Sequence, residues 1–142
     1  MSQHDGDNAL TEKQFRHRAE AKRRVALGMV EDREHCREAW VAAGFAVEFA
    51  LKALIMRENA WANWPSSAEQ PHVHVHNLRV LMQIANIDLA VVPKKFRAPI
   101  RQILDWERRH DYHGKIMPRK IARSMTDAAF GEAGVVEWLN QK

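Results

Sequence analysis

The chain has 142 residues, of which 46% are hydrophobic and 28% are charged, which fits one folded domain and excludes a disordered chain. Its uninterrupted apolar stretches, such as residues 41–47, are much shorter than the roughly 20 residues of a membrane span, and we expect no secretory signal at the N-terminus. Cys36 is the single cysteine, which excludes an internal disulfide framework and favours a cytoplasmic setting.

The first half of the chain predicts a short leader and two long helices. Residues 1–10 are polar and are expected to form a flexible leader, so that residues 11–142 make up the single domain. Thr11 is a suitable N-cap for a basic helix that runs to about Met29. A second helix is expected over residues 34–58, and its apolar residues recur at the three- and four-residue spacing of a bundle helix: Trp40, Ala43, Val47, Ala50 and Leu54.

The second half predicts a long loop and shorter helices. Prolines and polar residues mark 59–76 as a loop, after which residues 77–85 form a short helix. Pro93 is expected to open a helix that continues to about residues 107–108, and a last helix is expected from about Thr126 to Leu139. The pattern predicts an all-α protein, an antiparallel bundle of four to five helices.

Positive charge is concentrated in one part of the chain. Residues 94–123 carry 10 basic and 3 acidic side chains, whereas residues 1–93 carry 11 basic and 12 acidic ones. Such a segment either forms a solvated helix face or attracts a phosphate-bearing partner. If the partner is RNA, we expect its backbone to contact Lys94, Lys95, Arg97, Arg101, Arg119, Lys120 and Arg123.

Three histidines alternate along the loop before the third helix. His72, His74 and His76 would share one face of an extended chain, and neutral imidazole is the commonest metal ligand. They are weak candidates for a metal site, because Glu69 is the nearest residue that could complete it. The expectation is therefore no metal and no cofactor, with His76 capping or packing against the helix that it precedes.

A segment rich in arginine and histidine lies within the basic stretch. Arginine can bind a phosphate with two parallel hydrogen bonds, and histidine exchanges protons near neutral pH. These groups suffice to cleave RNA without a metal, and the candidates are Arg108, Arg109, His110, Tyr112 and His113. On a regular helix Arg109 and His113 share a face, whereas Arg108 and His113 diverge unless the helix ends there. The alternative is a helix end that carries cations because the helix dipole favours them.

Three motifs together resemble the HEPN domain family. The run 46–54, with Glu48 inside Ala-Val-Glu-Phe-Ala-Leu-Lys-Ala-Leu, is similar to the family's alanine-rich helix. His76-Asn77-Leu78-Arg79-Val80-Leu81 resembles its His-x-Leu-x-x-Leu opening of a helix. Arg108 and His113, with four residues between them, are similar to its RNase signature, and the resemblance covers roughly residues 11–140.

The resemblance implies a helical bundle that pairs into a homodimer and cleaves RNA at the cleft between subunits. Arg108 would bind phosphate and His113 would act in acid–base chemistry, with Arg109, His110 and Tyr112 in support. A defence or toxin–antitoxin role, with an antitoxin partner, is part of this expectation. The alternative is a HEPN interaction or nucleotide-binding module that does not cleave and that partners a nucleotidyltransferase. A fold does not decide between the two.

Overall fold

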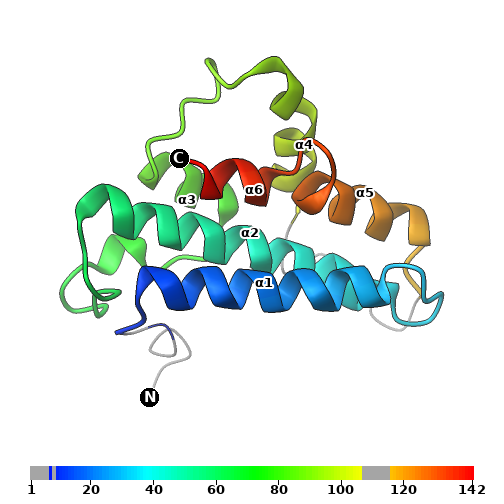
Figure 1. Cartoon of the computed structure of the whole chain (residues 1–142), viewed down its shortest axis with the longest axis horizontal. Coiled ribbons are helices and arrows are strands. Elements are labelled where there is room, and N and C mark those ends of the chain that lie inside the picture. The colour runs from blue at the N-terminus through cyan, green and yellow to red at the C-terminus, as the bar shows by residue number, and fades with distance from the viewer. Residues whose placement is uncertain (1–6, 8, 107–115) are drawn as a thin grey trace.

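The computed structural model describes Asp7 and residues 9–106 and 116–142, and the regular elements among these residues are helices, with no strand (Figure 1). The elements are α1 (Glu12–Met29), α2 (Cys36–Asn59), α3 (Leu78–Ile84), α4 (Lys94–Leu104), α5 (Arg119–Phe130) and α6 (Val135–Asn140), with a 3₁₀ turn, η2, at Pro71–Val73. The all-α prediction is confirmed.

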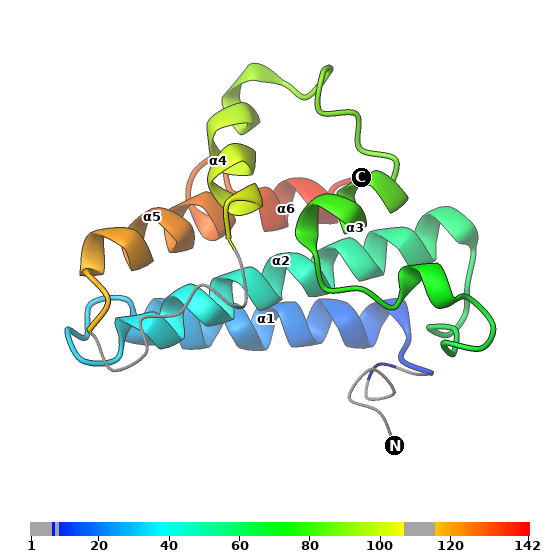
Figure 2. The same ribbon diagram turned by 180° about the vertical axis from the view of Figure 1, so that it is seen from behind.

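The helix α1 begins where the sequence predicts. The Thr11 side chain accepts a hydrogen bond from the Gln14 backbone N–H at 3.1 Å, and the Gln14 side chain accepts one from the Thr11 N–H at 2.8 Å. This reciprocal capping box satisfies two N–H groups that would otherwise lack partners at the helix start. Six residues then connect α1 to α2, so the two long helices lie side by side and run in opposite directions (Figures 1 and 2).

The helix α2 forms the centre of the molecule. It packs against α1 on one side and against α3, α5 and α6 on others, so the predicted apolar stripe is buried and so are most of the residues beside it. Among the described residues, α2 is the one helix long and apolar enough to cross a membrane, yet 89% of its apolar window is buried inside the protein. The sequence of α2 has no uninterrupted apolar run of that length, because Glu48 and Lys52 lie among its apolar residues.

An ion-pair network joins the start of α1 to the end of α2. The Glu12 carboxylate accepts hydrogen bonds from Arg57 at 2.7 Å and from Arg16 at 3.0 Å. Burial raises the pKa of Glu12, but these two hydrogen bonds and the charges of both arginines outweigh burial and hold the pKa below its ordinary value. The carboxylate form is therefore favoured in the folded protein.

Three predicted elements differ from the structure. The described part of the leader is docked: the Asp7 carboxylate pairs with Lys52, the Ala9 N–H donates to the Trp64 carbonyl at 3.0 Å, and the Trp64 N–H donates to the Leu10 carbonyl at 2.8 Å. The fourth helix ends at Leu104 instead of residues 107–108, because the chain turns to bring Trp106 onto α2.

The third difference is the C-terminal helix, which is two helices, α5 and α6. Gly131 ends α5 with an extended ψ of −164°, and its N–H donates to the Asp127 carbonyl at 2.7 Å. At Gly134 a Cβ would lie 2.8 Å from the Ala129 carbonyl oxygen, so a residue with a side chain does not fit this turn without a shift. The turn lets Trp138 of α6 stack on Phe96 of α4, with ring centroids 5.1 Å apart.

Candidate functional site

The buried face of α2 carries an ionisable cluster made of Asp7, Glu48, Lys52 and His76, called the polar cluster below. Glu48 and Lys52 are 1% and 2% exposed and stand one helical turn apart, with the Lys52 ammonium 3.2 Å from the Glu48 carboxylate. The Asp7 carboxylate of the leader also pairs with Lys52. The His76 Nδ1 lies 3.0 Å from the same Glu48 oxygen that Lys52 approaches.

Local structure positions each member of this cluster. The Asn77 side chain accepts a hydrogen bond from the Val80 N–H at 3.0 Å and caps α3, which fixes His76 directly before the helix. Two aromatic rings approach the Lys52 ammonium, Phe15 at 6.0 Å and Trp64 at 5.5 Å from their centroids. These rings shield the ammonium from water, which strengthens its pairing with the carboxylates.

The sequence contains a signal for the polar cluster that is independent of the resemblance to a family. Two ionisable residues four positions apart, inside a helix that is otherwise apolar, are buried more often as a pair than singly. Glu48 and Lys52 fit that pattern. His76 does not cap the helix that it precedes, because Asn77 is the N-cap of α3 and the printed partner of the His76 ring is Glu48 of α2.

The alternating histidines do not share a site. His72 is exposed, the His74 Nε2 lies 2.8 Å from the Pro65 carbonyl oxygen, and His76 is directed to Glu48. In the part of the chain that the structure describes, no three His, Cys, Asp or Glu side chains form a group that could hold a metal ion. The extended face that would align these histidines is interrupted by the 3₁₀ turn η2.

The proposed catalytic residues Arg108 and His113, with Arg109, His110 and Tyr112, lie outside the described residues. The residues on either side of this segment are both anchored on the first half of α2. The Trp106 indole N–H donates to the Trp40 carbonyl at 3.0 Å, and the ring packs 5.4 Å from that of Trp40. After the segment, the Cys36 thiol donates to the Met117 carbonyl at 3.1 Å.

Gly44 makes the first of these anchors possible. A Cβ at this position would lie within 2.5 Å of three atoms of the Trp106 indole, Cδ2, Cε2 and Cζ2. Only a residue without a side chain lets the ring lie flat on the helix here. Gly44 also stands one turn before Glu48 on the same helix, so this anchor and the polar cluster occupy neighbouring turns of α2.

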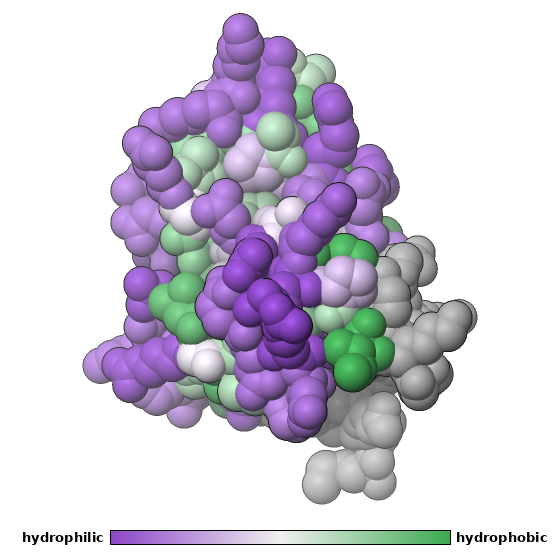
Figure 3. Space-filling view, turned by 90° about the vertical axis from the view of Figure 1, so that its right-hand side faces the viewer, coloured by the Kyte–Doolittle hydropathy of each residue, from purple (hydrophilic) through white to green (hydrophobic). Residues whose placement is uncertain are grey.

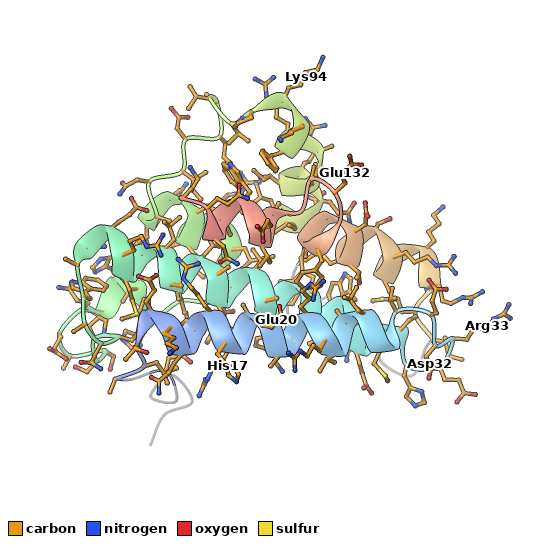
Figure 4. All side chains as sticks on the ribbon, viewed as in Figure 1. His17, Glu20, Asp32, Arg33, Lys94 and Glu132 are labelled. Carbon is orange, nitrogen blue, oxygen red and sulfur yellow. The ribbon has the colours of Figure 1, made fainter. Side chains whose placement is uncertain are left out.

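The basic residues divide into two groups. In the first, α4 carries Lys94, Lys95, Arg97 and Arg101, and Lys94 projects from the end of α4 that is far from α1 (Figure 4). In the second, α5 begins with Arg119 and Lys120, followed by Arg123. Arg123 forms two hydrogen bonds with the Glu31 carboxylate, and Arg119 lies 3.7 Å from it.

The pairing with Glu31 reduces the net charge of the second group. The Arg123 hydrogen bonds lower the pKa of Glu31 below its ordinary value, so this carboxylate stays charged beside the arginines. The surface at this end of the molecule is mostly hydrophilic, with smaller hydrophobic areas (Figure 3). The first group thus offers the less compensated positive charge.

Comparison of the chain with protein-family models, with curated proteins and with solved structures gives no match.

Proposed function

We propose that this protein is a metal-independent endoribonuclease of the HEPN type that acts as a homodimer. The observation that supports it is the double anchoring of the segment rich in arginine and histidine. Before the segment, Trp106 is hydrogen-bonded to Trp40. After the segment, Met117 is hydrogen-bonded to Cys36, so both flanking residues are held against the first half of α2. Fixed flanking residues limit the positions that the residues between them can take, which favours a defined site for a substrate.

The proposed reaction is an internal attack by the RNA itself. A base removes the proton of a ribose 2′-hydroxyl, the 2′-oxygen attacks the neighbouring phosphorus, and the bond to the 5′-oxygen breaks. An acid gives a proton to that leaving oxygen, and the products are a 2′,3′-cyclic phosphate and a 5′-hydroxyl. His113 serves in the proton transfers, and Arg108 stabilises the charge that develops on the phosphate. In a homodimer these two groups come from facing subunits.

The polar cluster gives α2 a structural role in this proposal. Breaking a buried ion pair leaves an uncompensated charge, so the Glu48–Lys52 pair and its contact to His76 fix α2 and the start of α3 in one arrangement. The anchor for Trp106 lies one turn away on the same helix. The cluster thus supports the scaffold, and we assign it no step in the reaction.

The test compares cleavage of a structured RNA by the wild type, His113→Ala and His17→Ala, all in EDTA. His17 is an exposed histidine of α1 and serves as a matched control (Figure 4). We expect cyclic phosphate ends from the wild type and from His17→Ala, and loss of cleavage in His113→Ala. Equal cleavage by all three proteins would refute the assignment of His113. No cleavage by any of them, with RNA binding retained, would favour the interaction module.

A further inference from the structure

A pocket of about 260 Å³ lies between α3, the connection that follows it, and α4. Three arginines line it: Arg79 from α3, and Arg97 and Arg101 from α4. Arg97 and Arg101 stand four residues apart and so share one face of α4, and Arg79 is contributed by the other helix that lines the pocket. Arg79 lies outside the basic stretch 94–123, and only the fold brings it to Arg97 and Arg101.

The arginines of this pocket are not neutralised by their surroundings. None of the three forms an ion pair with a residue that the structure describes, and Asp105 is the one carboxylate among the lining residues. The Arg97 Nε donates to the Val92 carbonyl at 3.1 Å, which fixes the guanidinium at the pocket edge. Three guanidinium groups that line one pocket attract an anion with several oxygens, and phosphate matches their paired donors.

The remaining wall of the pocket is apolar. It is formed by Leu89, Val92, Ile100 and Leu104. Leu89 is 36% exposed, so an apolar surface is available at the pocket mouth. A bare phosphate ion would gain nothing from this wall, whereas a nucleotide presents both a phosphate and a flat base.

A second pocket offers less positive charge to a ligand. It lies between α1 and α5 and is larger, at about 390 Å³, with Leu27, Val30 and Phe130 in its wall. Its arginine, Arg123, is paired with Glu31, so the lining offers no uncompensated cation for a phosphate.

We propose that the pocket lined by Arg79, Arg97 and Arg101 binds one nucleotide unit of single-stranded RNA. The phosphate pairs with the arginines, and the base or ribose packs on the apolar wall. The assignment to RNA rests on the proposed function, since Asp105 of this pocket stands three residues before Arg108 in the sequence. The pocket then holds a nucleotide near the one that is cleaved and selects unpaired RNA.

The experiment measures binding of a fluorescent octanucleotide RNA whose 2′-hydroxyls are methylated, so that the RNA cannot attack its own phosphate. Arg79→Gln and Arg101→Gln are compared with Arg24→Gln, which removes the same charge from an exposed side chain of α1. We expect each pocket variant to weaken binding about tenfold, as for a lost charged hydrogen bond. The slope of log affinity against log salt should fall by about 0.7 in each. Arg24→Gln should change affinity less than about twofold.

A fourth variant tests the apolar wall. Leu89→Ser should weaken binding of the RNA about threefold and leave binding of inorganic polyphosphate unchanged, because polyphosphate has no base to place on the wall. Equal losses in Arg24→Gln and the pocket arginine variants would overturn the proposal, and so would equal weakening of RNA and polyphosphate by Leu89→Ser. Circular dichroism checks that each variant is folded.

The outcome is separate from that of the nuclease test. A pocket that binds RNA in a protein without cleavage would retain this proposal and refute the nuclease. Cleavage that depends on His113, with affinity unchanged in Arg79→Gln and Arg101→Gln, would support the nuclease and refute the nucleotide pocket.

Discussion

The close contact between Gly44 and Trp106 makes Gly44→Ala the most informative single substitution. Alanine at an exposed helix position is more favourable than glycine by about 1 kcal/mol. At Gly44 the new Cβ would instead overlap three atoms of the Trp106 ring, which packs on α2 in contact with the rings of Trp40 and Phe45. We therefore expect the indole to leave its site and the protein to lose stability.

The size of the effect follows from what the indole loses. Trp106 is 6% exposed, and a buried tryptophan removes about 150–250 Å² from water, worth roughly 4–6 kcal/mol. If about half of that surface returns to water and the hydrogen bond to Trp40 is lost at about 1 kcal/mol, the cost is roughly 3–4 kcal/mol. Subtracting about 1 kcal/mol for the better helix former leaves a net loss of about 2–3 kcal/mol.

Urea denaturation followed by circular dichroism measures this loss, with Gly28→Ala as the matched control. Gly28 also lies in a helix, but a Cβ there meets nothing within 4 Å, so Gly28→Ala should raise stability by about 0.5–1 kcal/mol. In a Trp106→Leu background, Gly44→Ala should become neutral or stabilising, because the ring that it overlaps is gone. A gain in stability from Gly44→Ala in the wild type would refute the packing argument.

Three further predictions concern stability and are checked by chemical denaturation. Lys52→Met should lower the free energy of unfolding by about 3–5 kcal/mol, because it leaves Glu48 buried without its cation; a loss below about 1 kcal/mol would contradict the pairing. Glu12→Gln should lower stability at neutral pH. The folded-state pKa of Glu12 is depressed, so its contribution is full above its ordinary pKa of 4.5 and is lost as the pH falls through the folded value; a constant difference from pH 7 to acid would contradict this. Ala60→Gly should raise stability by about 0.5–1 kcal/mol, because Ala60 ends α2 at a φ of 54°, and a loss would refute the strain.

The helices that the sequence predicted well have strong local signals. Thr11 and Gln14 form a capping box that needs no tertiary contact, and Asn77 caps α3 in the same way. The period of apolar residues identified α2 to within two residues at its start. Such signals act between residues three or four positions apart, so they are visible in the sequence.

The incorrect predictions depend on contacts between distant parts of the chain. Residues with apolar spacing on both sides of Gly131 and Gly134 predicted one helix, but α6 turns away to place Trp138 on Phe96. The docked leader is a similar case, since Asp7 is held by Lys52, 45 positions away. Loop residues of this type have no periodic pattern from which their contacts could be predicted.

The candidate site also has a part that the sequence predicts and a part that only the structure shows. Arg108 and His113 are predictions from the sequence, and they lie outside the described residues. The structure adds the anchors on both sides of them and the pocket arginine Arg79, which lies 18 residues before Arg97 and belongs to another helix. The structure also shows that Arg119 and Arg123 pair with Glu31, which distinguishes them from the cations of α4.

By itself, the sequence determined that the chain is helical, where most helices begin, and which residues can carry acid–base and phosphate chemistry. Tertiary structure alone decided that Glu48 and Lys52 are buried together, that Gly44 receives Trp106, and that three arginines from two helices line one pocket. The physical reason is the range of the forces. Capping and helix periodicity act within one or two turns, whereas burial and ion pairing depend on which distant surfaces the whole fold brings together.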